Sequence, residues 1–247
     1  MLDGVISLHT SPRATAEAAL TCAGASKMNE SHQCADLISH LRAAGATGVD
    51  EYALKLKANE KNEETFHDLF FEGKAALMFL DHRWQVELRD RPDLKLQFAG
   101  ELLYAEVKHF RRKELDLKDE DAMRAATNEL VRYGDLGTAE GFEAWEQVVM
   151  VAKKKAGQYV EGAPNILLVE SSTVSLELMA TSAVHAIDDA CESGDLGLCR
   201  LSGFVLVDAS GWTSFGTAQR DVEFCKTSHA AVPLSENLCR ALDEIRS

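Results

Sequence analysis

Two acidic side chains and one lysine stand at a spacing that could bring them together on a β-sheet. Asp93 opens one alternating apolar segment, and the next such segment contains Glu106 and Lys108. Side chains two positions apart in a strand project from the same face, so Glu106 and Lys108 should point the same way. A tight turn at Gly100 would fold Asp93 back beside them. We therefore expect two carboxylates and an amine to converge.

Such a group suits the metal-assisted hydrolysis of a phosphodiester. Hard carboxylate oxygens bind Mg²⁺ or Mn²⁺, the metal polarises the phosphate and lowers the pKa of a bound water, and an ammonium group offsets developing negative charge. Without a metal, two close buried carboxylates would repel each other, and one would have to take up a proton.

Simpler structural roles for the same residues stay open. Glu106 and Lys108 could form a salt bridge on a solvated strand, worth at most about 1 kcal/mol. Asp93 follows Pro92, and Pro-Asp is a common turn sequence.

Changes in hydrophobic period indicate the elements that must position these residues. Helical spacing predicts helices over residues 34–44, 62–80, 119–133, 138–159, 173–189 and 234–245. Period-two alternation and short apolar runs predict strands over residues 84–88, 94–98, 102–110, 165–169, 204–207 and 222–225. This order predicts an α/β fold with a mixed central sheet flanked by helices.

The segments RPDLKLQF and AGELLYAEVKHF, in this order of elements, resemble the PD-(D/E)xK nuclease superfamily. Upstream, FHDLFFEGKAALMFLDHRWQVEL is similar to its first helix and first strand. Downstream, the helix up to Gln158 followed by PNILLVES is similar to its second core helix and fourth strand. The resemblance covers roughly residues 62–208. It implies a restriction-endonuclease-like core within residues 61–247, preceded by a helical N-terminal extension over residues 1–60.

The resemblance also implies a role for each matched residue. Asp93 and Glu106 would be ligands of Mg²⁺ or Mn²⁺, and the carbonyl of Val107 would complete the metal shell. Lys108 would position or activate the attacking water and steady the phosphate. Glu72 would orient a metal-bound water from the first helix. Two alternatives stay open for Glu72: an exposed helix carboxylate, or replacement by Asp68 one turn earlier.

Substrate contacts are expected from polar side chains near the third strand and the second core helix. These are Arg111, Arg112, Lys154 and Gln158. The basic runs that contain the first three are solvated faces by default. Their nearness to the expected site makes a phosphate-binding rim an equal alternative.

The composition limits the partners and the compartment. The 247 residues include 26 Lys and Arg against 40 Asp and Glu, a net charge of −14. This balance argues against a broad nucleic-acid or membrane-binding surface, but not against a small basic groove. The 6 cysteines form no CxxC pair and are expected as free thiols. No secretory signal or long apolar run is evident, so we expect a cytoplasmic protein without membrane contact.

The sequence therefore predicts a metal-dependent nuclease that acts on DNA rather than RNA, because most of the resembled superfamily cuts DNA. The alternative is a non-catalytic protein of the same fold that serves as a binding or assembly module, with a protein partner or a second copy of itself. The acidic net charge favours this alternative, since nuclease surfaces generally need Lys and Arg facing the phosphates.

Overall fold

The computed structural model describes residues 32–110, 144–171, 176–208 and 222–246. Its helices are α2 (Val49–Ala58), α3 (Glu63–Asp81), α5 (Ala144–Lys155), α6 (Leu176–Glu192) and α7 (Glu236–Asp243), with a further helix over residues 32–43. Its strands are β1 (Gln85–Leu88), β2 (Leu94–Phe98), β3 (Glu101–His109), β4 (Asn165–Ser171), β5 (Gly203–Asp208) and β6 (Val222–Lys226). The α/β class, with a mixed sheet flanked by helices, is confirmed.

The six strands form one sheet in the order β1-β2-β3-β4-β5-β6. Strands β1, β2 and β3 pair antiparallel, β3, β4 and β5 pair parallel, and β6 returns antiparallel to β5. A two-residue turn joins β2 to β3, and both of its residues, Ala99 (φ 50°) and Gly100 (φ 89°), have positive φ. This is the backbone of a tight hairpin turn that matches the strand twist. It sets Leu94 opposite Ala105, so Asp93 comes next to Glu106.

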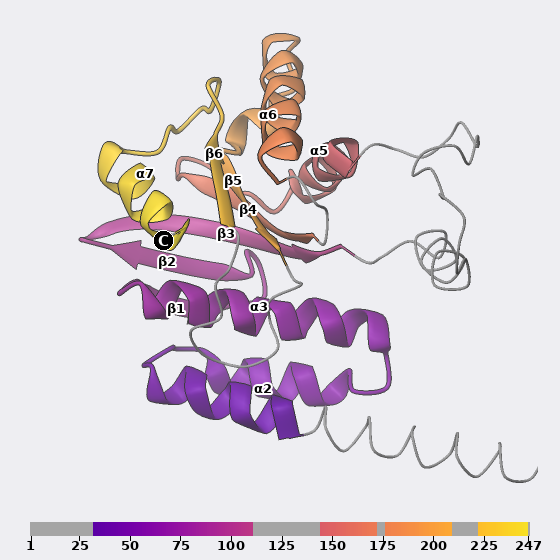
Figure 1. Ribbon diagram of the computed structural model, residues 1–247, viewed down its shortest axis with the longest axis vertical. Coiled ribbons are helices and arrows are strands. Elements are labelled where there is room, and N and C mark those ends of the chain that lie inside the picture. Colours follow the sequence, from indigo (N-terminus) through magenta and orange to yellow (C-terminus); the bar gives the residue numbers. More distant parts are fainter. Residues whose placement is uncertain (1–31, 111–143, 172–175, 209–221, 247) are drawn as a thin grey trace, which may run out of the picture.

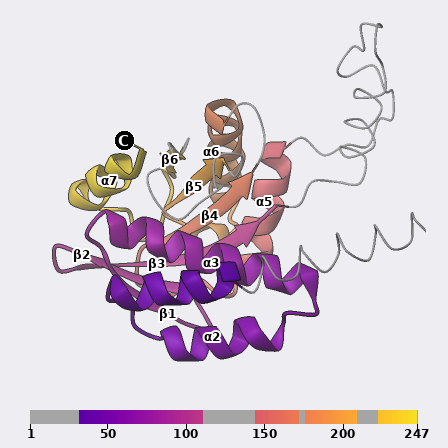
Figure 2. The same ribbon diagram turned by 60° about the horizontal axis from the view of Figure 1, so that its bottom comes forward.

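Helices cover the two faces of the sheet with two separate apolar cores. Figures 1 and 2 show α2 and α3 on one side of the sheet and α5 and α6 on the other. On β3, Leu103, Ala105 and Val107 belong to the core that contains α3. Because side chains alternate along a strand, Glu106 and Lys108 project toward the opposite face, which α5 and α6 cover.

Helix α3 begins where the sequence predicts and carries the first acidic residues of the site. The Asn62 side chain caps it by accepting a hydrogen bond from the Thr65 amide at 3.3 Å. Gly73 gives α2 room to approach: a Cβ there would lie 2.3 Å from the Tyr52 hydroxyl oxygen. That hydroxyl donates to the Leu69 carbonyl oxygen at 2.8 Å. The helices before α3 therefore share one core with it.

Two expectations differ from the structure or fall outside it. The helix expected over residues 138–159 ends at Lys155 in α5, and residues 156–158 form a turn. The helix expected over residues 119–133 lies outside the described residues. Among the helices that are described, none is both long enough and apolar enough to cross a membrane.

Candidate active site

Asp93 and Glu106 are buried side by side at the junction of β2 and β3. Asp93 is 7% exposed and Glu106 is 1% exposed. The Asp93 Oδ2 accepts a hydrogen bond from the Val107 amide at 2.8 Å. The Asp93 side chain thus takes the place of a backbone acceptor at the end of the hydrogen-bond ladder between β2 and β3. This fixes the Asp93 carboxylate beside the neighbouring Glu106.

The ammonium group that joins these two carboxylates belongs to Lys155. Its Nζ lies 2.5 Å from Glu106 Oε2 and 3.3 Å from Asp93 Oδ2. Lys155 is the last residue of α5, where a positive charge also interacts favourably with the helix dipole. The charged cluster is therefore assembled from β3, from the start of β2 and from the end of a helix on the same face.

Lys155 was not among the residues predicted for the site, whereas the predicted role of Lys154 as a substrate contact stays a prediction. Lys154 is exposed to solvent, and Gln158 lies in the turn beyond the helix end. A signal for Lys155 was present, because Val148 and Ala152 are fully buried and Lys155 continues their stripe at helical spacing. The position of the buried stripe on the helix therefore indicates that Lys155, and not Lys154, faces the sheet.

Lys108 is engaged with α3 rather than with the two strand carboxylates. Its Nζ lies 2.5 Å from Asp68 Oδ2. We expected Lys108 to meet Asp93 and Glu106 because it shares a sheet face with Glu106. Near the end of β3, its long side chain instead reaches the carboxylate that α3 presents. Asp68 Oδ1 is buried and finds no hydrogen-bond partner among the described residues.

Glu72 lies in the electrostatic field of the same cluster. Burial, followed by the negative charge of Asp93, raises the pKa of its carboxyl to about 9, against the opposing effects of Lys155 and Lys55. Near neutral pH this side chain holds a proton in the metal-free protein. The influence of Asp93 and Lys155 on Glu72 indicates that α3 brings a third carboxyl group toward the site.

The pKa of Glu106 is also raised, to about 7, by burial and by the neighbouring charge of Asp93, while Lys155 opposes the shift. Burial alone would lower the pKa of Lys155, but Asp93 and Glu106 outweigh it, and the net shift is upward. Lys155 is therefore charged, and it neutralises part of a site that holds more acidic groups than basic ones.

The donor set fits a hard divalent cation. Glu106 Oε1 is buried and has no hydrogen-bond partner in the described part of the chain, and Asp93 supplies a second carboxylate beside it. The described residues do not contain three His, Cys, Asp or Glu side chains arranged as a complete metal cage. Mg²⁺ does not require one, since it is usually bound by one or two carboxylates together with water and phosphate oxygens.

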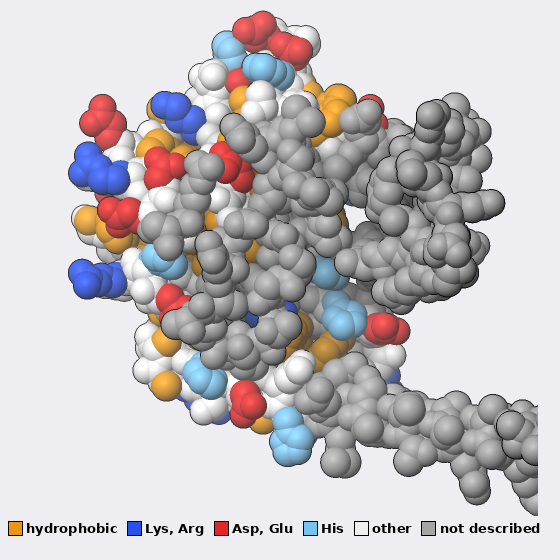
Figure 3. Space-filling view, viewed as in Figure 1, with side chains coloured by type: hydrophobic (Ala, Val, Ile, Leu, Met, Phe, Trp, Pro, Cys, Tyr) orange, Lys and Arg blue, Asp and Glu red, His pale blue; other side chains and the backbone are white. Residues whose placement is uncertain are grey.

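Other expected site residues are only partly located. The Val107 amide holds Asp93, and the use of its carbonyl as a metal ligand stays a prediction. Arg111 and Arg112 lie outside the described residues. On the face that Figure 3 displays, the visible Lys and Arg side chains stand among Asp and Glu side chains.

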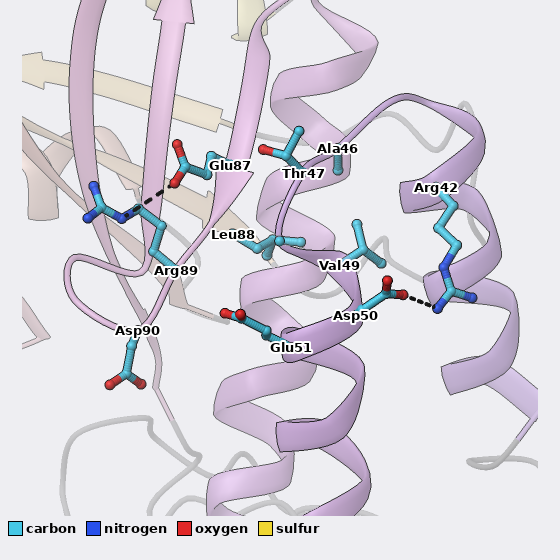
Figure 4. A pocket seen from close by; sticks show the side chains of 11 residues that line it. Arg42, Ala46, Thr47, Val49, Asp50, Glu51, Glu87, Leu88, Arg89 and Asp90 are labelled. Atoms are coloured by element: carbon cyan, nitrogen blue, oxygen red, sulfur yellow. Dashed lines mark hydrogen bonds and ion pairs between the residues drawn. The ribbon is translucent and has the colours of Figure 1, made fainter.

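A pocket of about 920 Å³ lies elsewhere, between the first helices and the edge strand β1. Figure 4 shows the acidic and basic side chains that line it, with Arg42 paired to Asp50 and Arg89 paired to Glu87. Its lining does not include Asp93, Glu106 or Lys155. We therefore assign the candidate chemistry to the carboxylate cluster and not to this pocket.

No family model matches this chain, and comparisons with curated proteins and with solved structures also found no significant match.

Proposed function

We propose that this protein is a metal-dependent nuclease with a restriction-endonuclease-like core, and that its substrate is DNA rather than RNA. One observation carries the proposal: Asp93 and Glu106 are buried on one sheet face, and both contact the ammonium group of Lys155. Two buried carboxylates held this close are costly without a positive charge beside them, and Lys155 supplies one such charge. Glu106 Oε1 stays buried without a hydrogen-bond partner among the described residues, so it remains available as a ligand for a metal ion.

The arrangement of the strands supports the same proposal. Helix α3 precedes the antiparallel strands β1, β2 and β3, and α5 leads into β4, which is parallel to β3. This is the order of helix, three strands, helix and strand that the resemblance to the PD-(D/E)xK superfamily implies. The carboxylates lie where β2 begins and β3 approaches its end, as that resemblance would require.

Each side chain would then have a distinct task. Asp93 and Glu106 would hold Mg²⁺ or Mn²⁺, which when bound polarises the phosphodiester and lowers the pKa of a water. Glu72 would hold a water by hydrogen bonding from α3. Lys155 would stabilise negative charge on the phosphate, and the Asp68–Lys108 pair would keep a second ammonium close to α3.

The test is cleavage of single-stranded, duplex and branched DNA and of RNA, each with Mg²⁺, Mn²⁺ or EDTA. We expect metal-dependent cleavage that Glu106→Gln reduces at least about a hundredfold. Glu87→Gln is the matched control, because Glu87 is a partly exposed strand carboxylate paired with Lys95 at 3.0 Å. Equal activity of Glu106→Gln and Glu87→Gln would contradict the proposal.

A second candidate function is a non-catalytic binding or assembly module. It is favoured by the net charge of −14, which repels nucleic acid, and by the internal neutralisation of Asp93 and Glu106 through Lys155. If the purified protein binds Mg²⁺ or Mn²⁺ but cleaves no substrate in the panel, this candidate is favoured over the nuclease.

A further inference from the structure

The Lys155 ammonium lies between the two carboxylates that a metal would use. It contacts one oxygen of each, Glu106 Oε2 and Asp93 Oδ2. We infer that Lys155 is an internal counter-ion which a divalent cation must displace before Asp93 and Glu106 can bind it together. This inference rests on the proposed metal-dependent function and adds a regulatory contact to the same site.

For reasons of both space and charge, the Lys155 ammonium and a divalent metal ion cannot occupy the site between Asp93 and Glu106 together. A magnesium ion bound by carboxylates lies about 2.0–2.1 Å from its oxygen ligands. An ammonium nitrogen at 2.5 Å from Glu106 Oε2 occupies the region that such an ion would fill. A dication placed next to it would also be repelled, and the repulsion would be poorly screened because Glu106 is 1% exposed.

Only the Lys155 side chain needs to move when a metal ion replaces its ammonium group. The Lys155 side chain is 21% exposed and begins at the end of α5, so its four-carbon stem can turn toward solvent without moving the helix. Lys108 does not compete for the vacated carboxylates, because Asp68 holds its ammonium at 2.5 Å. The displaced Lys155 ammonium would then lie at the solvent edge of the site, where it is available to a phosphate oxygen.

Metal affinity provides a test that does not depend on cleavage. Mn²⁺ binding to the full chain is measured by calorimetry at pH 8 for the wild type and for Lys155→Met. We expect Lys155→Met to bind Mn²⁺ at least about tenfold more tightly, because the competing cation is gone. Lys153→Met is the matched control: it removes the same charge from an exposed position on the same helix and should change the affinity less than about twofold.

Affinity that is unchanged or weaker in Lys155→Met would overturn the inference, as would absence of Mn²⁺ binding in both proteins. Tighter binding without cleavage of any nucleic acid would uphold the inference and contradict the nuclease proposal, so the two failures are distinguishable.

A second measurement covers the case in which Lys155→Met does not fold. In the wild type with ¹⁵N-labelled lysine, Mg²⁺ should accelerate hydrogen exchange at the Lys155 ammonium, because its two carboxylate partners are lost. An exchange rate that Mg²⁺ does not change would overturn the inference.

Discussion

A backbone group helps to fix the Asp93 carboxylate: the Val107 amide donates a hydrogen bond to its Oδ2 at 2.8 Å. The amide belongs to the residue that follows Glu106 in β3. The two carboxylates are therefore held together by the register of β2 and β3, whether or not a cation is present.

Asp93→Asn should preserve this hydrogen bond and lower the pKa of Glu106. The amide oxygen can still accept from Val107, while the negative charge that raises the pKa of Glu106 is removed and Lys155 remains. The pKa of Glu106, about 7 in the wild type, should fall by about one unit or more. Carbon-detected NMR titration of labelled glutamate measures it. A pKa for Glu106 that stays at the wild-type value would show that Asp93 does not act on it.

Without divalent metal, the protein should become less stable as the pH rises from about 5 to 9. The pKa values of Glu106 and Glu72 in the folded protein, about 7 and about 9, both lie above the ordinary value of 4.5. Between 4.5 and those values the folded state binds more protons than the unfolded state, so the free energy of unfolding falls with pH. Urea unfolding in EDTA at several pH values measures this.

Glu72→Gln separates the two contributions. The neutral amide mimics the protonated carboxyl, so the variant should be more stable than the wild type at pH 8 by at least about 1 kcal/mol, with little difference at pH 5. If the free energy of unfolding of Glu72→Gln falls with pH above pH 7 as steeply as that of the wild type, that pH dependence belongs to other groups.

Mg²⁺ should raise the melting temperature at pH 8, because it binds the folded state and not the unfolded chain. Asp93→Ala should remove this response, since it deletes one of the two carboxylates that would hold the metal. Thermal unfolding with Mg²⁺ or with matched ionic strength from KCl distinguishes metal binding from screening. Equal Mg²⁺-induced shifts in the wild type and in Asp93→Ala would contradict a site at Asp93.

Gly73→Ala should destabilise the protein by about 1–3 kcal/mol, because the added methyl group meets the Tyr52 hydroxyl and a methyl of Leu37. Tyr52→Phe should restore part of the loss in the double variant, since it removes the closest atom. Gly157→Ala is the control: a Cβ there meets nothing within 4 Å. Chemical denaturation that gives the same loss for both glycines would disprove the packing explanation.

The strand residues of the site could be predicted because their positions depend on local rules. Period-two alternation places Glu106 and Lys108 on one face, and the Ala99–Gly100 turn sets the register that brings Asp93 to Glu106. Neither rule requires knowledge of the helices.

The ion-pair partners could not be predicted by the same rules. Whether Lys108 meets Glu106 or Asp68 depends on where α3 lies over the end of β3, which is a tertiary relationship. The choice between Lys154 and Lys155 depends on the rotation of α5 about its axis. The buried stripe through Val148 and Ala152 records that rotation in the sequence, but the spacing of the carboxylates does not.

The contact between Tyr52 and Leu69 affects how the chain can be divided. Tyr52 is 4% exposed, and its hydroxyl donates to a carbonyl oxygen on the turn of α3 that lies between Asp68 and Glu72. A protein cut just before Glu63 would lose this donor and would expose the apolar surface of α3 that Leu37 and Tyr52 cover. The helices over residues 32–58 are therefore not an appendage that can be exchanged between chains, and any shortened form that keeps the acidic cluster in place must begin before them.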